Sequence, residues 1–315
     1  MQSYRSALPQ LEGDLFLTEV GLETCLIFYD GLDLPCFATF PLLETDAGKR
    51  SLRAYYRPLL RLARDTQTGF ILDTLTWRAN ADWGAHLGYD VSALARANRQ
   101  AVDFAIEVAR DFADPRYPVV LNGSIGPRGD GYRPDVLMTV SEAERYHSVQ
   151  IATFSETALD MVSAFTLNYI DEAIGIARAA RAHGLPAVLS FTVETDGRLP
   201  TGDTLRSAIE AVDRATGASP AYYMINCAHP SHVERALDED GIWRERIRGL
   251  RANASAKSHA ELDASTEIDA GDPLALAAAY RALHARLPRL NVLGGCCGTD
   301  YRHLEVIMTA WQAAT

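Results

Sequence analysis

The chain has 315 residues, of which 48% are hydrophobic, so it can bury a large core. Lysine and arginine number 30 against 41 aspartate and glutamate residues, which gives a formal net charge of −11. This acidic balance, without any basic block, argues against binding to nucleic acid or to an anionic membrane surface.

The N-terminus and the cysteine content indicate where the protein works. Residues 1–14 carry no apolar core of signal-peptide length, and no apolar run approaches the ~20 residues of a membrane span. We therefore expect a soluble, cytoplasmic protein in a compartment that keeps thiols reduced. Five cysteines, an odd number, suit metal binding or catalysis better than a disulfide framework. These patterns leave the oligomeric state open.

Short apolar runs alternate with amphipathic stretches along the whole chain. The runs predict strands at Leu15–Thr18, Phe70–Leu75, Val119–Asn122, Met161–Phe165, Ala187–Thr192, Ala221–Ile225, Gly249–Ala252 and Leu290–Leu293. Four stretches between these runs predict helices. Two carry an apolar stripe: Leu94 to Val108, after an Asp90 cap, and Leu205 to Val212, which ends at Gly217. The other two are marked by a Ser141–Glu144 capping box and by the Ala/Leu-rich segment Pro273–Leu287.

Alternation of strands and helices implies a parallel sheet. Eight such repeats predict an α/β fold, a single (β/α)8 TIM barrel that forms one domain over residues 1–315. The alternative, an open doubly wound sheet, lacks a GxGxxG fingerprint after the first strand. Two irregular insertions, Tyr29–Thr45 and Asn253–Asp272, follow predicted strands. We expect both to lie over the C-terminal mouth of the barrel, where loops commonly complete an active site.

Three cysteines stand at the ends of predicted strands. Cys227 ends the sixth, and Cys296 and Cys297 follow the eighth within the segment VLGGCCGTD, Val292–Asp300. The C-terminal ends of barrel strands face one central opening, so the three thiolates can converge on one metal ion. Zinc is the expected occupant because it is bound well by cysteine, and three protein ligands leave one position open for chemistry.

Other interpretations of the cysteines and nearby histidines remain open. Cys227 can be a small buried residue beside an incidental pair, or Cys296 and Cys297 can form a strained vicinal disulfide. The two other cysteines, Cys25 and Cys36, are interpreted as ordinary buried or loop residues. Histidines near the cysteines are interpreted mainly as structural, at a helix start (His229, His232) and as an exposed or capping residue (His303).

Five short segments carry a family resemblance. They are Gly123–Pro127 (GSIGP), Ser190-Phe191 with Asp196-Gly197, Asn226-Cys227, Asn253, and Gly294–Gly298 (GGCCG). In this order and at this spacing, the sequence resembles the homocysteine S-methyltransferase family over nearly its whole length. The resemblance implies a (β/α)8 barrel, Zn²⁺ held by the three cysteines, and methylation of homocysteine to methionine.

The implied chemistry has a physical basis. A free thiol has a pKa of ~8.5, so little thiolate is present at neutral pH, and coordination to zinc removes the proton. The thiolate then attacks a methyl group on a donor with a positively charged leaving group. For the small-molecule donor, S-methylmethionine or S-adenosylmethionine is expected, and betaine remains open.

The resemblance also implies substrate-binding residues and reveals departures. Ser124 and Asn226 lie in matching motifs, and Glu19 and Asp73 lie at the ends of predicted strands near the mouth. Trp77 is a candidate for cation–π contact with the donor. The departures are Glu19 in place of an aspartate, Arg78 in place of a glutamine, and Phe165 in place of a glutamate that holds the substrate amino group. Arg78 is therefore a candidate partner for a carboxylate.

These departures keep rival functions in view. Loss of the carboxylate at Phe165 favours the same zinc chemistry on a thiol other than homocysteine. A non-catalytic zinc- or ligand-binding barrel is a second rival, and a barrel enzyme that does not use zinc is a third. Turnover, acceptor preference and the effect of Cys227→Ser distinguish them.

Overall fold

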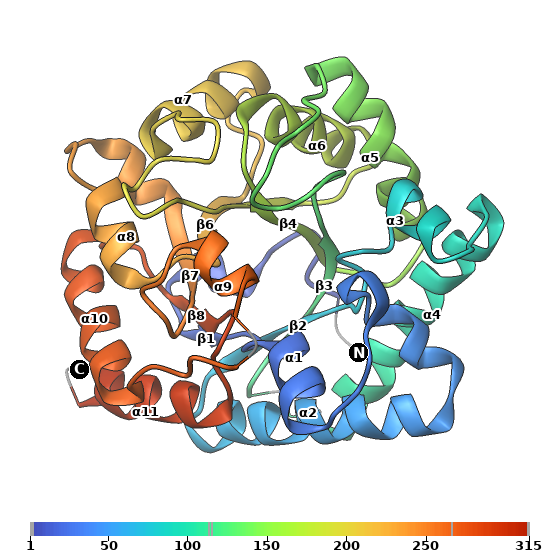
Figure 1. Cartoon of the computed structure of the whole chain (residues 1–315), viewed down its shortest axis with the longest axis horizontal. Helices are drawn as coiled ribbons and strands as arrows, with labels where there is room; N and C mark the ends of the chain where they lie inside the picture. Colours follow the sequence, from blue (N-terminus) through green and yellow to red (C-terminus); the bar gives the residue numbers. More distant parts are fainter. Residues whose placement is uncertain (1–2, 113, 115, 266, 314–315) are drawn as a thin grey trace.

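The chain folds into a closed barrel of parallel strands surrounded by helices (Figure 1). The computed structural model describes residues 3–112, 114, 116–265 and 267–313. The strands follow one another around the barrel in sequence order: β1 (Phe16–Leu17), β2 (Gly69–Asp73), β3 (Val119–Ile125), β4 (Met161–Leu167), β5 (Ala187–Phe191), β6 (Tyr222–Asn226), β7 (Ile247–Ala252) and β8 (Val292–Gly295). The predicted α/β class and (β/α)8 barrel are confirmed.

Most helices cover the outside of the barrel. The helices are α1 (Leu22–Thr24), α2 (Asp46–Asp65), α3 (Ala81–His86), α4 (Val91–Asp111), α5 (Val140–Ser155), α6 (Ile170–Ala182), α7 (Leu205–Thr216), α8 (Pro230–Ala236), α9 (His259–Asp263), α10 (Pro273–Arg286) and α11 (Tyr301–Gln312). Of these, α1 and α9 lie at the C-terminal mouth of the barrel. In the part of the chain that the structure describes, no helix has both the length and the apolar character to cross a membrane.

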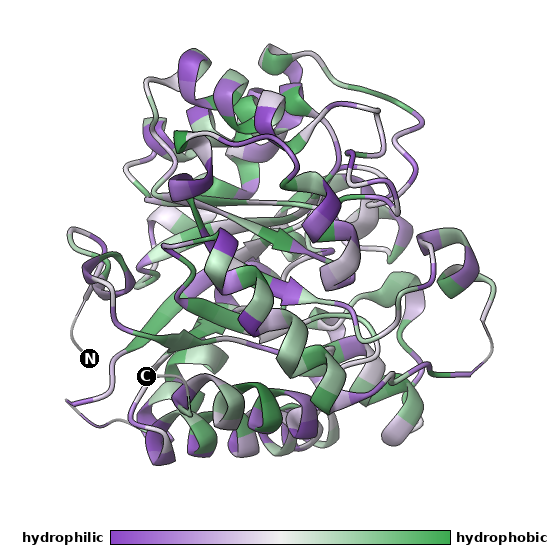
Figure 2. Cartoon of the chain, turned by 90° about the vertical axis from the view of Figure 1, so that its left-hand side faces the viewer, coloured by the Kyte–Doolittle hydropathy of each residue, from purple (hydrophilic) through white to green (hydrophobic). Residues whose placement is uncertain are grey.

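A period of two along each strand divides its side chains between the barrel interior and the helix layer. The interior layer contains Phe16, Ile71, Val120, Met161, Val188, Tyr222 and Val292. Their chain neighbours Leu17, Leu72, Leu121, Val162, Leu189, Tyr223 and Leu293 belong to the larger core beneath the helices. Figure 2 shows the hydrophobic strands enclosed by helices that mix both colours. Two to four residues further along the same inward face, the strands carry polar groups such as Asp73, Ser124 and Asn226.

The strand predictions are confirmed, and the eighth needs a correction at its ends. It was expected at Leu290–Leu293 and is found at Val292–Gly295. Gly294 and Gly295 pair with β7 instead of forming a turn. A Cβ atom on Gly295 would lie 2.2 Å from the hydroxyl oxygen of Thr299. Glycine is therefore needed for close packing inside the strand, which a sequence pattern does not distinguish from a turn.

Helix ends follow most of the predicted signals. Asp90 caps α4 by accepting a hydrogen bond from the Ala93 amide at 2.7 Å, and Gly217 ends α7 with φ of +65°. The predicted Ser141–Glu144 capping box is wrong. The box is Thr139 with Glu142, because Thr139 has the extended backbone of an N-cap while Ser141 is already helical.

Both irregular insertions reach the C-terminal mouth, as predicted. Residues of the first (Cys36, Phe37 and Thr39) and of the second (Leu262, Ser265 and Asp269) line the same cavity. In Figure 1, α9 lies over the barrel opening. The insertions therefore form the outer wall of the cavity.

The corrected cap makes a stability prediction. We expect Thr139→Ala to lower the free energy of unfolding by about 0.5–2 kcal/mol, because the amide of residue 142 loses its acceptor. Ser141→Ala is the matched control, since Ser141 is exposed within the helix, and it should change stability by less than about 0.5 kcal/mol. Urea denaturation of both variants measures the difference. A larger loss from the Ser141 variant would contradict the Thr139 assignment.

Candidate functional site

One cavity at the C-terminal mouth collects the residues that the sequence singled out. Its volume is about 600 Å³. The cavity is lined by Glu19, Asp73, Trp77, Ser124, Asn226, Cys227, Cys296 and Cys297, together with Arg78 and Phe165. These side chains come from β1, β2, β3, β4, β6 and β8 and from the loops that follow them. The closed barrel brings them together from positions more than 270 residues apart in the chain.

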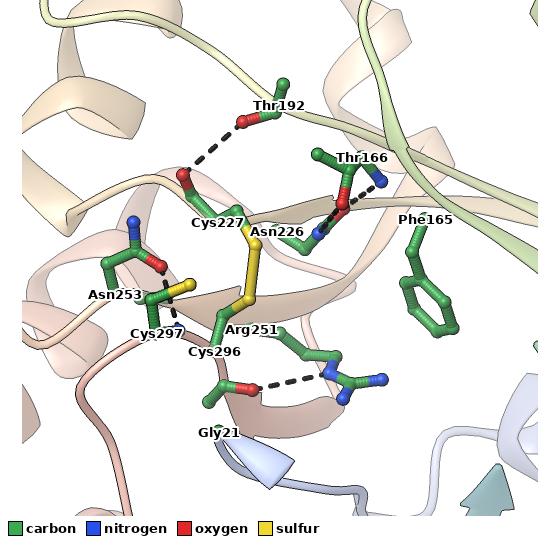
Figure 3. Close-up of a disulfide and its surroundings, with 12 residues drawn as sticks. Gly21, Phe165, Thr166, Thr192, Asn226, Cys227, Arg251, Asn253, Cys296 and Cys297 are labelled. Atoms are coloured by element: carbon green, nitrogen blue, oxygen red, sulfur yellow. Dashed lines mark hydrogen bonds between the residues drawn. A yellow bond between two sulfur atoms is a disulfide. The ribbon is translucent and has the colours of Figure 1, made fainter. Parts of the chain in front are cut away.

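The three cysteines form a compact group. One sulfur atom from each of Cys227, Cys296 and Cys297 lies within 4.8 Å of the others. Figure 3 shows a disulfide between Cys227 and Cys296, with the Cys297 sulfur beside it. The vicinal disulfide between Cys296 and Cys297 is therefore not the pair that forms. The expected reduced state of all three thiols also differs from this structure, because two of the sulfurs converge closely enough to bond.

The backbone of Cys227 is fixed from several sides. Its amide donates to the Arg251 carbonyl at 3.1 Å. Its carbonyl accepts from the Thr192 hydroxyl at 3.3 Å and from the His259 ring at 2.5 Å. Cys227 has φ of +52°, a left-handed conformation that costs roughly 1–3 kcal/mol in a residue other than glycine. These hydrogen bonds maintain that conformation directly after β6.

The Cys296–Cys297 pair is fixed by the end of β7. The Cys296 amide donates to the Ala252 carbonyl at 2.9 Å, and the Cys297 amide donates to the Asn253 side-chain oxygen at 3.1 Å. Gly298 follows with φ of +79°, and a Cβ atom there would lie 2.5 Å from the Asp269 carbonyl oxygen. The turn therefore requires glycine, which explains the last residue of the GGCCG motif.

The cysteine group fits a zinc ion in its reduced form. Ligands on a tetrahedral zinc ion with ~2.3 Å bonds stand ~3.8 Å apart, which is compatible with sulfurs within 4.8 Å of one another. Among the described residues, no other histidine, cysteine or carboxylate completes a fourth ligand in this group. Reduction of the disulfide would release two of the three thiolates for binding. Metal binding therefore requires reducing conditions.

Below the cysteines, two carboxylates flank one buried arginine. Arg251 donates to Asp73 at 2.5 Å and lies 3.8 Å from Glu19. Burial raises the pKa of Glu19 well above its usual range, and Asp73 raises it further, while Arg251 opposes both effects. Burial likewise raises the pKa of Asp73, and Arg251 and Asn122 counteract it. The three groups carry one excess negative charge when both carboxylates are ionised.

The two aromatic site residues each contact a cation of the protein. The Arg251 guanidinium lies 4.6 Å from the Phe165 ring centroid. The Arg78 guanidinium lies 4.0 Å from the Trp77 ring centroid, and the Trp77 indole nitrogen donates to the Phe165 carbonyl at 3.5 Å. Arg78 therefore covers a face of Trp77 that the sequence analysis assigned to a cationic donor. Among the described residues, Arg78 has no carboxylate partner.

Asn226 and Ser124 differ in their hydrogen-bond partners. The Asn226 side chain accepts from the Thr166 amide at 2.9 Å and from the Ser190 hydroxyl at 2.6 Å, and it donates to the Thr166 hydroxyl. It thereby joins β4, β5 and β6 next to Cys227. Ser124 lines the cavity, and its amide donates to Thr74 at 3.0 Å. Binding of substrate by either residue stays a prediction.

Sequence reasoning missed Arg251 and His259. Arg251 is a charged residue within an otherwise apolar strand, and that pattern was a usable signal. His259 contacts the Cys227 carbonyl with one ring nitrogen and Glu194, at 2.9 Å, with the other. Nothing in the local sequence of α9 indicates this contact, because it depends on how the insertion folds back.

The remaining cysteines and histidines have structural positions. Burial raises the pKa of the Cys25 thiol to about 12, so this cysteine stays protonated, as an ordinary buried cysteine would. Cys36 lies on the cavity wall, outside the three-sulfur group. His229 caps α8, as its place at a helix start suggested. His303 takes part in the cap of α11 and is buried, so of the two expected roles capping is confirmed and exposure is wrong.

Glu19 makes a pH prediction for stability. Its raised pKa means that the folded protein resists ionisation of this carboxyl. The stabilisation from the protonated form is fully present below the unfolded pKa of 4.5 and is lost as pH rises through the folded value. We expect Glu19→Gln to melt at a higher temperature than the wild type at pH 8, because the amide does not have to give up a proton in the buried site.

The stability advantage of Glu19→Gln over the wild type should vanish near pH 4, where the wild-type carboxyl is protonated in both the folded and the unfolded state. Thermal melts of the reduced, metal-free proteins across this range measure it. A Glu19→Gln variant that is less stable at pH 8 would show that the attraction of Arg251 outweighs the burial of Glu19.

Comparisons with known proteins agree with this geometry. The chain is similar to the homocysteine methyltransferase MmuM from Escherichia coli in its metallated form, with a TM-score of 0.74 at 17% identity over 95% of this chain and 97% of that one. The oxidized form of MmuM gives a TM-score of 0.75 at 18% identity over the full length of both chains. At these identities the likeness shows the shared barrel fold.

A family model described as Homocysteine S-methyltransferase matches residues 49–311. The match includes β2 to β8 and all three cysteines of the cavity. The protein is therefore a methyltransferase and belongs to the homocysteine S-methyltransferase family.

Proposed function

We propose that this protein transfers a methyl group to the sulfur of homocysteine, forming methionine, with Zn²⁺ held by Cys227, Cys296 and Cys297. The observation that carries the proposal is the group of three sulfurs within 4.8 Å of one another at the wall of the cavity. Family membership supports homocysteine as the acceptor. When bound, zinc would lower the pKa of the acceptor thiol and favour its nucleophilic thiolate form.

The protein's own residues would position the reactants. The hydrogen bonds to Cys227 and to the Cys296–Cys297 pair fix the three sulfurs before substrate arrives. Glu19 and Asp73 line the same cavity as the cysteines, and the acceptor's ammonium group would pair with them, which would offset the rise in the pKa of Glu19 that burial causes, while Arg251 limits the repulsion between the two carboxylates. Methyl transfer forms no oxyanion, so the site needs alignment of sulfur, methyl carbon and leaving atom more than a general base.

The methyl donor proposed is a sulfonium, S-methylmethionine or S-adenosylmethionine, with betaine as the alternative. The leaving atom of each carries a positive charge, which the thiolate group and the two carboxylates attract. We also propose that the protein works in the cytoplasm. The reducing conditions there keep Cys227 and Cys296 as thiols, which metal binding requires.

A second candidate is the same chemistry on another thiol. It is favoured by Phe165, which presents a ring to Arg251 where the family resemblance expects a carboxylate for the substrate amino group. A thiol without an α-ammonium group would then be accepted.

Substitution of a cysteine ligand tests the metal. We expect the reduced wild type to bind about one zinc ion per chain, as the tetrahedral cysteine site implies. Cys227→Ser should lose both the zinc and methionine formation, because serine oxygen is a poor zinc ligand. Cys25→Ser is the matched control, since Cys25 lies outside the three-sulfur group, and it should keep both. Metal analysis and a methylation assay with S-methylmethionine measure this. A reduced wild type that takes up no zinc would rule out the mechanism.

Acceptor preference separates the two candidate functions. We expect homocysteine to be methylated with a kcat/KM at least about tenfold above that of 3-mercaptopropanoate, a thiol without the ammonium group, because an ion pair with Glu19 is worth more than about 1.4 kcal/mol in a buried site. Initial rates with both thiols at fixed donor measure the ratio. A ratio at or below one would favour the second candidate and point to Phe165.

A further inference from the structure

Arg78 is held flat between two indole rings on the cavity wall. Its guanidinium carbon lies 4.0 Å from the Trp77 ring centroid and 3.9 Å from the Trp83 ring centroid. All three side chains line the cavity. Both faces of the guanidinium are covered, so only its edges are left for hydrogen bonding. An arginine in this setting is fixed in one orientation before any ligand binds.

The hydrogen bonding of Arg78 is incomplete. Its Nη1 donates to the Gly129 carbonyl at 3.2 Å. Its Nε is buried without a partner, and within the described residues Nη2 has no hydrogen bond and the side chain no ion pair. Only 6% of the residue is exposed. Asp130 and Glu23, which also line the cavity, attract this charge from a distance without an ion pair. A guanidinium keeps its charge at any physiological pH, and a buried charge without a hydrogen-bonded counterion is costly.

Arg251, the other arginine of the cavity, provides the contrast. It is paired with Asp73 and lies close to Glu19, and its Nε donates to the Gly295 carbonyl at 3.4 Å. Arg251 therefore already has its counterions. Arg78 leaves the edge formed by Nε and Nη2 unused, which is the edge that binds a carboxylate with two parallel hydrogen bonds.

A purely structural role explains only part of this arrangement. The stacking and the bond to Gly129 connect the segment after β2 with the loop after β3. A neutral side chain could provide those contacts without burying a charge. The unused donors at the cavity wall therefore indicate an anionic group of a ligand.

The position of Arg78 in the barrel indicates which of the two substrates carries the anionic group. Arg78 follows β2, whereas Cys227 follows β6, and these strands lie on opposite sides of the eight-stranded barrel. Figure 1 shows α3, which carries Trp83, across the barrel from α8, which follows Cys227. A thiol bound at the cysteines would lie near Arg251, whose Nε donates to the carbonyl of Gly295, the residue before Cys296. The far side of the cavity is left for the second substrate.

We propose that Arg78 binds the carboxylate of the methyl donor. The inference rests on the proposed function, because it assumes a donor with a cationic methylated atom at one end and a carboxylate at the other. Such a donor is aligned by charge: its cation faces the thiolates and its carboxylate faces Arg78. Arg78 thereby orients the methyl carbon toward the acceptor sulfur and disfavours donors that lack an anionic group.

Binding measurements on the reduced, zinc-loaded protein test this inference. The probes are S-methylmethionine and its carboxamide, which differ in the carboxylate, and titration calorimetry gives their dissociation constants. We expect the wild type to bind the acid about 10–100-fold more tightly than the amide, as a charge-assisted hydrogen-bonded pair implies. Arg78→Gln should lose this preference by weakening the acid alone. Arg78→Lys should keep part of it, because the charge remains while the planar fork is lost.

Arg128→Gln is the matched control. Arg128 lies in the loop after β3 and pairs with Asp82 at 2.7 Å, away from the cavity lining, so this variant should bind both probes as the wild type does. In steady state, Arg78→Gln should raise the KM of the donor about 10–100-fold and change kcat much less.

Three results would overturn the inference. Equal weakening of acid and amide binding in Arg78→Gln would mark a structural role. Loss of discrimination between homocysteine and its amide in this variant would assign Arg78 to the acceptor. Equal binding of acid and amide by the wild type would show that no group of the cavity recognises the donor carboxylate. A wild type that prefers the acid and yet forms no methionine would leave the inference standing and refute the proposed function.

Discussion

The arrangement of the site depends on hydrogen bonds from the end of β7 to both cysteine-bearing segments. The Arg251 carbonyl accepts from the Cys227 amide, and the Ala252 carbonyl accepts from the Cys296 amide. The next residue, Asn253, holds the second cysteine of the pair through its side chain. Because β7 lies between β6 and β8 in the barrel, one strand end fixes the distance between ligands that are 69 residues apart in the chain. Residues outside the three-cysteine group thus set its geometry.

Charge divides the cavity into two regions. Near the cysteines, Arg251 is neutralised by Asp73 and Glu19 within a buried network that continues to the Tyr56 hydroxyl, 2.9 Å from Glu19. Across the barrel, Arg78 keeps its charge between two aromatic rings. A reaction that joins an anionic sulfur to a cationic methyl carbon benefits from such separation. In the proposed arrangement each substrate would meet the opposite charge at its own end of the cavity, so that little reorganisation would be needed for their reaction.

Elements with a strong local pattern could be predicted, and those that depend on packing could not. Short apolar runs placed every strand, and Asp90 and Gly217 marked true helix ends. The cap of α5 was misplaced by two residues because two overlapping segments have the same Ser/Thr-to-Glu spacing, and only backbone geometry distinguishes them. The glycines of β8 serve close approach to neighbouring chain segments, which the sequence pattern did not reveal.

The sequence by itself determined the barrel, the position of three cysteines at strand ends and the family to which their motifs point. These features follow from local periodicity and from residue types, which a linear chain displays directly. The tertiary structure decided what each polar group contacts. Asn226 faces Thr166 and Ser190, Arg251 faces two carboxylates, and Arg78 lies between two tryptophans. Such contacts join distant segments, and their strength depends on burial and distance, which only the folded chain defines.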